Sequence, residues 1–192
     1  MRVIAAALLG LALLTAASCS KPAPKEYANP AWNFAASFVG EPKATETKAN
    51  GGQPASLLVV SSGGGHDFSV YVMDVSSATV PPDQILANAP EALASSQDID
   101  LGPTTNANAG GVNGREVLFT KDDKPAIVVR FFVAGGKLYE VNASVPAGAT
   151  DPDARAFLDS FRLLTPPPAP PAANTAPAAN ATNAAAPAAN AG

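Results

Sequence analysis

The sequence has few of the residue types that carry most metal and redox chemistry. Its 192 residues include one cysteine, Cys19, and one histidine, His66. A lone cysteine cannot form a disulfide within the chain, so a disulfide-stabilised scaffold is excluded. One histidine without a second histidine or a nearby cysteine does not give the ligand spacing of a zinc site.

Positive charge is also scarce. The formal net charge is −4, and between Glu26 and Thr165 nine lysine or arginine residues stand against sixteen acidic residues. No basic stripe is available to neutralise phosphates, which argues against a nucleic-acid partner. A polybasic lipid-binding surface is excluded on the same ground.

The N-terminus, in contrast, is typical of an export signal. Met1 and Arg2 precede an apolar run of about fifteen residues, shorter than the ~20 residues that span a bilayer. The segment from Leu14 to Cys19, LTAASC, resembles a bacterial lipobox, in which the cysteine is diacylated and becomes the new N-terminus. We therefore predict a lipoprotein signal peptide over residues 1–18 and lipid attachment at Cys19. The alternative is an ordinary secretory signal cut after Ala17.

The lipid anchor predicts a location in the cell envelope. Each buried methylene of an acyl chain contributes ~0.8 kcal/mol, so two or three chains hold a protein firmly at a membrane. Ser20 follows the cysteine, whereas enteric-type lipoproteins retained at the inner membrane commonly have aspartate there. We expect periplasmic exposure, and the outer membrane is favoured over the inner one.

Composition divides the rest of the chain into three parts. Residues 19–29 form a polar tether, and residues 30–165 are long enough for one domain with a core. Residues 166–192 contain only proline, alanine, asparagine, threonine and glycine. Such a tail cannot bury enough surface to offset the entropy of ordering, so we predict that it is disordered.

The centre of the domain is predicted to be a β-hairpin over Pro125–Val145, turning near Gly135 and Gly136. A two-residue Gly-Gly loop would mix apolar and polar side chains on both faces. A three-residue loop instead collects one apolar face, made of Ile127, Val129 and Phe131 opposite Ala143, Val141 and Tyr139. We predict the three-residue loop, which places Arg130 directly across from Glu140.

Other patterns predict the remaining elements. Alternating or continuous apolar residues indicate strands over 32–38, 55–62, 67–75 and 115–120, with loops over 44–54 and 104–114. A helix is predicted from Pro81, with Pro90 kinking or dividing it. A closing helix begins with Asp151 as N-cap and directs Phe157 and Phe161 at the sheet. The predicted fold class is α+β, a single antiparallel β-sheet flanked by helices.

Candidate catalytic and ligand-binding residues are few. His66 follows three glycines, but the strand after it excludes a phosphate loop, and we interpret it as a hairpin-loop residue. As a metal ligand His66 would need Asp67 or Asp74. Other weighed candidates lack a supporting pattern: Asp98 and Asp100 for calcium, Ser61, Ser62 and Ser69 as nucleophiles, and Glu116, Glu140 and Asp159 as a carboxylate pair. We predict no catalytic, metal or cofactor-binding residue, and no enzyme activity.

Several segments resemble the PsbP-like superfamily, small α/β/α sandwich proteins whose bacterial relatives are often exported lipoproteins. The segments are Phe34 with Ser37–Pro42, then Gly114–Glu116, Arg130 with Leu138 and Tyr139, and Phe157–Phe161. The resemblance implies an antiparallel sheet with helices and a binding or assembly role, and it supplies no catalytic residues. We therefore predict a non-catalytic module with an envelope protein as partner. A small-ligand or metal-binding carrier is the first alternative, and a hydrolase is the second.

Overall fold

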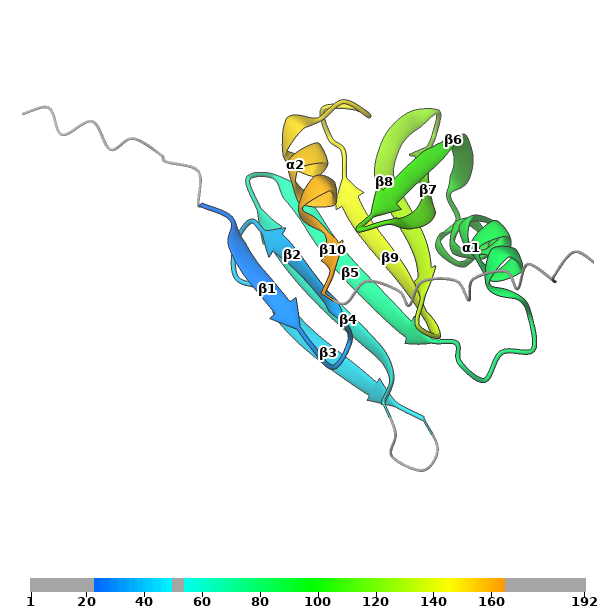
Figure 1. Ribbon diagram of the computed structural model, residues 1–192. Helices are drawn as coiled ribbons and strands as arrows, with labels where there is room; N and C mark the ends of the chain where they lie inside the picture. Colours follow the sequence, from blue (N-terminus) through cyan, green and yellow to red (C-terminus); the bar gives the residue numbers. More distant parts are fainter. Residues whose placement is uncertain (1–22, 50–53, 165–192) are drawn as a thin grey trace, which may run out of the picture.

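The computed structural model describes residues 23–49 and 54–164, and these form two antiparallel sheets and two helices (Figure 1). The strands are β1 (Lys25–Asn29), β2 (Phe34–Phe38), β3 (Lys43–Lys48), β4 (Pro54–Gly63), β5 (His66–Asp74), β6 (Asp100–Ala109), β7 (Val112–Lys121), β8 (Lys124–Ala134), β9 (Lys137–Ser144) and β10 (Arg162–Leu163). The helices are α1 (Pro82–Gln97) and α2 (Pro152–Ser160). None of the described helices is long and apolar enough to span a bilayer.

The predicted single sheet flanked by helices is wrong. Seven strands form the large sheet in the order β3-β4-β5-β9-β8-β7-β6, while β1, β2 and β10 form a separate sheet with β2 in the middle. The opening strand over residues 34–38 therefore leaves the main sheet and pairs with Lys25–Asn29, which we had placed in the tether. Most of the structure is strand, and the second sheet takes the place of a helical layer.

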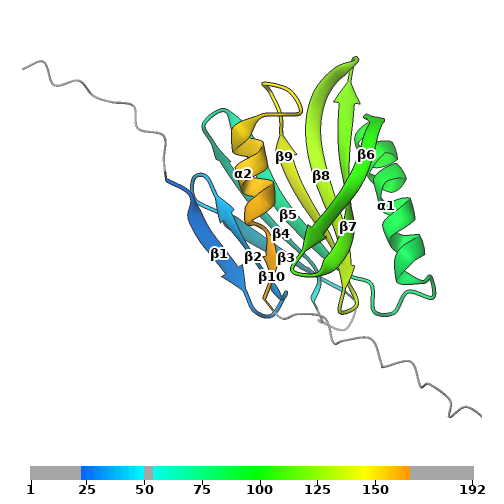
Figure 2. The same cartoon turned by 45° about the horizontal axis from the view of Figure 1, so that its top comes forward.

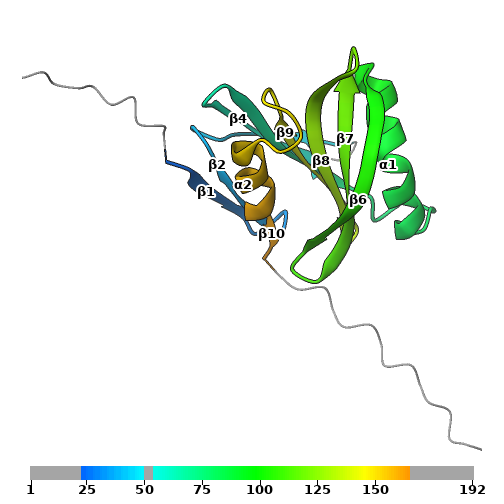
Figure 3. The ribbon, with the colours of Figure 1, turned by 90° about the horizontal axis from the view of Figure 1, so that it is seen from above.

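Two different layers cover the two faces of the large sheet (Figures 2 and 3). The small sheet and α2 cover one face, and the core between them includes Phe34, Phe38 and Phe157. On the opposite face, α1 packs over β6, β7 and β8, with Leu93 among buried side chains such as Phe119 and Phe131. This helix does not extend over β3 and β4, so that part of the face stays uncovered.

The central hairpin forms, but its predicted register is wrong. Arg130 pairs with Val141, and Glu140 pairs with Phe131, so the turn is the two-residue Gly135-Gly136 loop. Both glycines have positive φ, at 57° and 72°, as a tight turn matched to the strand twist requires. The register argument failed because it assumed that only one face of β8 is buried. In the structure both are, since Phe131 faces α1 and Phe132 faces α2 and the small sheet.

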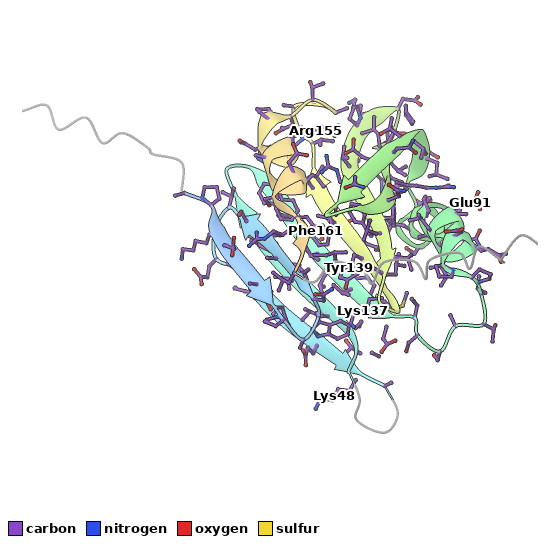
Figure 4. All side chains as sticks on the ribbon, viewed as in Figure 1. Lys48, Glu91, Lys137, Tyr139, Arg155 and Phe161 are labelled. Carbon is purple, nitrogen blue, oxygen red and sulfur yellow. The ribbon has the colours of Figure 1, made fainter. Side chains whose placement is uncertain are left out.

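Both helices lie where the sequence predicted them. Helix α1 runs through the buried Pro90 without being divided. Helix α2 begins at the N-cap Asp151, whose side chain accepts hydrogen bonds from the backbone amides of Asp153 and Ala154. Phe157 is buried, as predicted, and Phe161 is buried just after the helix, where its ring lies 5.8 Å from that of Tyr139 (Figure 4). Burial raises the pKa of Tyr139 to about 12, although a hydrogen bond with Asn33 acts to lower it. The Tyr139 hydroxyl donates a hydrogen bond to the backbone oxygen of Trp32.

Candidate functional site

The uncovered part of the large sheet contains a groove between α1 and β4. It has a volume of about 430 Å³, and its floor consists of side chains from the adjacent strands β5 and β9. The residues that line it are Leu58, Ser69, Tyr71, Ala92, Leu93, Ser96, Gln97, Glu140 and Asn142. A second hollow of about 350 Å³ shares Ser69, Gln97 and Asn142 with the first, so the two are continuous along the sheet.

Glu140 is the acidic side chain that lines the groove. The strand register places it between Tyr71 of β5 and Phe131 of β8, and it is half-buried. Within residues 23–49 and 54–164, no lysine or arginine forms an ion pair with it. Burial without a compensating charge raises the pKa of Glu140 from 4.5 to about 7. The groove therefore contains a carboxyl group that titrates near neutral pH.

The remaining lining combines fixed polar groups with apolar surface. The Asn142 side-chain amide donates to Ser69 Oγ at 3.1 Å, which fixes both side chains on the floor of the groove. Leu58 is 39% exposed on β4, and Leu93 of α1 forms part of the facing wall. A concave surface of this composition suits a ligand that presents both apolar and polar groups.

His66 lies away from this groove, in a cluster with the start of α2. It is the first residue of β5 and is buried, with Nε2 2.8 Å from Asp151 Oδ2 and Nδ1 3.0 Å from the backbone oxygen of Gly64. Asp67 and Asp74, the partners considered from the sequence, are not its partners here. The ligand atoms of His66, Asp151 and Asp153 lie within 4.8 Å of one another, a donor set that could hold a metal ion.

The Asp151 carboxylate in that cluster is already engaged. Burial opposes its ionisation, but hydrogen bonds from His66 and from the amides of Ala154 and Asp153 outweigh burial and lower the pKa of Asp151. A metal ion would have to compete with these hydrogen bonds. We therefore interpret the contact between His66 and Asp151 as a structural link that fixes α2 on the sheet.

Of the carboxylates considered as a catalytic pair, Glu116 and Asp159 converge on Arg130, whereas Glu140 lies apart from both. Glu116 accepts from Arg130 Nε at 2.7 Å and also pairs with Arg155 of α2, while Asp159 accepts from Arg130 Nη2 at 2.7 Å. Burial raises the pKa of Glu116, but its hydrogen bonds from Arg155 and Arg130 more than compensate and lower it overall. Glu140 lies on the other face of the sheet, so the predicted cross-strand pair with Arg130 does not form.

The other sequence candidates have separate positions. Ser62 donates to Asp67, Ser69 accepts from Asn142, and the buried Ser61 Oγ has no hydrogen-bond partner among the described residues. Asp98 and Asp100 lie at the end of α1 and the start of β6. Cys19, the predicted lipid-attachment residue, is outside the described residues.

Comparison with known proteins finds similarity only at the level of structure. No family model and no curated protein matches the sequence. The chain is similar to cyanobacterial PsbP (CyanoP) from Synechocystis sp. PCC 6803, with 9% identity and a TM-score of 0.48 over 79% of this chain and 98% of that one. It is also similar to PA94 from Pseudomonas aeruginosa, a protein of unknown function, with 10% identity and a TM-score of 0.39 over 77% of this chain and 99% of that one.

A cyanobacterial PsbP is thus among the structural neighbours. At these identities and scores the neighbours do not assign the chain to a family.

Proposed function

We propose that this chain is an exported, lipid-anchored protein whose folded domain is a non-catalytic binding module. The observation that carries the binding role is the uncovered face of the large sheet, where a groove lies between α1 and β4. Leu58 and Val60 are each 39% exposed beside it on β4. Large apolar side chains that remain exposed next to a concave surface are typical of binding sites.

The position of Glu140 supports a non-catalytic role for the groove. Glycoside hydrolysis needs two carboxyl groups at most ~9.5 Å apart. On the face that contains Glu140, the acidic side chain of β5 is Asp67, whose amide contacts Ser144 on β9. Ser144 lies four strand positions from Glu140, a separation of roughly 13 Å. Glu140 therefore has no second carboxylate at a working distance along β5.

The lipid anchor rests on the sequence LTAASC that ends at Cys19. Five residues separate Cys19 from Lys25, where β1 begins. The six Cα–Cα steps between them span at most ~20 Å when extended, so an anchored domain would lie close to the membrane surface. This placement favours a partner that is itself part of the cell envelope, and it favours the periplasmic side.

A second candidate function is that of a small-ligand carrier. It is favoured by the volume of the groove, about 430 Å³, which falls in the range of small-molecule sites. A carrier and a protein-binding module would use the same face of the sheet, so the two functions are distinguished by whether a small molecule or a protein binds there.

The anchor is tested by replacing Cys19 with alanine and labelling bacteria that express the full chain with radioactive palmitate. The proposal predicts that the native chain is labelled and sediments with membranes, whereas Cys19→Ala is unlabelled and soluble. Ser20→Ala is the matched control, and it should behave as the native chain does. A labelled or membrane-bound Cys19→Ala chain would contradict the anchor.

The binding face is tested by placing a photo-crosslinking amino acid at Leu58, with Asn113 on β7 as an exposed control position. We expect light-dependent adducts with one reproducible envelope protein from position 58 and none from position 113. Equal adducts from both positions, or none from position 58, would argue against a protein partner at this face.

A further inference from the structure

We propose that the groove between α1 and β4 binds a small organic cation, and that the carboxylate of Glu140 holds its ammonium group. This inference rests on the proposed binding role of the uncovered face and specifies the chemical class of the ligand. Three features of the groove lead to it: an unpaired carboxyl group, an adjacent aromatic ring, and flanking apolar side chains.

The first feature is that Glu140 differs from the other sheltered carboxylates of the domain. Glu116 is paired with two arginines, and Asp151 is hydrogen-bonded to His66 and to two backbone amides. No such cation or donor reaches the Glu140 carboxylate from residues 23–49 or 54–164. A sheltered carboxylate is stabilised by an opposite charge, and here a ligand would have to supply it.

The second feature is the ring beside the carboxyl group. Tyr71 is the direct strand partner of Glu140 on β5 and lines the same groove. A cation placed against a tyrosine ring is attracted by its π-electrons as well as by the carboxylate. Tyr71 and Glu140 are the titratable residues in the lining, and α1 contributes only uncharged side chains to it.

The third feature is the pair of apolar side chains that flank the carboxyl group, and it favours an organic cation over a metal ion. Leu58 on one side and Leu93 on the other provide apolar walls about the carboxylate. The groove lining offers one carboxylate, and the group of potential metal ligands in the described part of the chain, His66 with Asp151 and Asp153, does not include Glu140. An alkylammonium or trimethylammonium group needs one counter-charge, and its carbon atoms would contact the leucines.

The volume of the groove, and helix α1 along one side of it, favour a free small molecule as the ligand. A lysine side chain of a protein partner would present the same ammonium chemistry, and the test separates these two sources. The probes are choline and butylamine, together with a neutral isostere of choline in which a tert-butyl group replaces the trimethylammonium group. Binding to the full mature chain is measured by titration calorimetry above pH 7, where Glu140 is ionised.

We expect saturable binding of at least one of the two cations, and at least about tenfold weaker binding of the neutral isostere. Glu140→Gln should weaken cation binding by at least about tenfold as well. Glu91→Gln is the matched control, because Glu91 is exposed on α1 outside the groove lining, and it should bind the cations as the native chain does (Figure 4). Circular dichroism of each variant checks that it is folded.

Two results would overturn the inference. One is that neither cation binds at millimolar concentration. Binding of a lysine-bearing peptide in place of the two cations counts as the same result. The other is that the isostere and the cations bind equally well to the native chain and to Glu140→Gln. In either case, adducts from position 58 would still support the proposed binding module, so the two proposals can fail separately.

Discussion

His66 and Asp151 form a buried contact between two segments that are 85 residues apart, with Nε2 of the imidazole 2.8 Å from Oδ2 of the carboxylate. It joins the start of β5 to the N-cap of α2. The second ring nitrogen, Nδ1, faces the backbone oxygen of Gly64 at 3.0 Å, so both nitrogens have oxygen partners. Asp151 in turn accepts two backbone amides of the helix. One carboxylate therefore starts the helix and attaches it to the sheet.

We predict that Asp151→Ala destabilises the domain by roughly 2–4 kcal/mol. The lost N-cap accounts for ~0.5–2 kcal/mol and the unsatisfied buried imidazole for ~1–3 kcal/mol. Urea unfolding at neutral pH measures the change. Asp83→Ala is the control, since Asp83 is an exposed residue in the first turn of α1, where no side chain caps the helix. A loss as large in Asp83→Ala would show that the effect is not specific to Asp151.

The same contact predicts a loss of stability in acid. Because the pKa of Asp151 is lowered in the folded chain, the unfolded state takes up its proton first as the pH falls. The contribution of Asp151 is complete above its ordinary pKa of 3.8 and disappears as the pH falls through the lower folded value. The difference in unfolding free energy between the native chain and Asp151→Ala should therefore shrink below pH 4. A difference independent of pH would contradict this.

Gly114 is a position where we predict that no side chain is tolerated. A Cβ atom there would lie 2.3 Å from the backbone oxygen of Phe131 and 2.4 Å from Cδ1 of Phe132. Gly114→Ala must displace β8 or its buried ring, and we expect a loss of about 3 kcal/mol. Gly135→Asn is the control, because a Cβ at Gly135 meets no atom within 4 Å and asparagine accepts a left-handed φ. Thermal unfolding of both variants tests the contrast, and equal losses would argue against the strand pairing of β7 with β8.

The ion pairs between α2 and the sheet should differ greatly in their importance. The side chains of Glu116 and Arg130 are 14% and 15% exposed, whereas that of Asp159 is 66% exposed. Glu116→Gln removes the carboxylate that Arg155 pairs with and one of the two that Arg130 pairs with, and it should cost about 3 kcal/mol. Asp159→Asn should cost at most ~1 kcal/mol. Urea unfolding would refute this ranking if the two variants were equally destabilised.

Glu140 is predicted to destabilise the free domain as the pH rises. Between its ordinary pKa of 4.5 and its raised value of about 7, the unfolded chain has lost the proton that the folded chain keeps. The folded state then binds more protons, so stability falls as the pH rises through this range. Above pH 7, Glu140→Gln should be more stable than the native chain by up to roughly 3 kcal/mol. Urea unfolding across this range measures the stability of the native chain, of Glu140→Gln and of the control Glu91→Gln. Parallel stability curves for the native chain and Glu140→Gln would refute the prediction.

The sequence predicted the strands that are buried and missed those at the edges. The apolar runs over 55–62 and 115–120 are strands β4 and β7, inside the large sheet. The segments interpreted as loops or tether contain β1, β3 and β6, and each of these is an edge strand. Every residue of β3 is exposed, and its side chains carry no burial pattern. Its strand conformation comes from pairing with β4, an interaction that the composition of β3 itself does not encode.

The candidate site could not be predicted from the sequence for a related reason. Glu140 was predicted to pair with Arg130, and that error followed from treating β8 as buried on one face only. The second sheet, formed by β2 with β1 and β10, buries the other face of β8. The residue pattern of β8 alone does not predict this second sheet. The contact of His66 with Asp151 was likewise invisible, although Asp151 itself was correctly predicted as the N-cap. Capping is local, whereas the histidine lies on β5, 85 residues earlier in the chain.

The most direct test of the binding site is a titration of the Glu140 carboxyl carbon by nuclear magnetic resonance, in the free protein and with saturating choline or butylamine. We predict a midpoint near pH 7 in the free protein, because burial raises this pKa to about 7, and a clearly lower midpoint when the cation supplies the missing counter-charge. A midpoint near 4.5 in the free protein, unchanged by either cation, would contradict it.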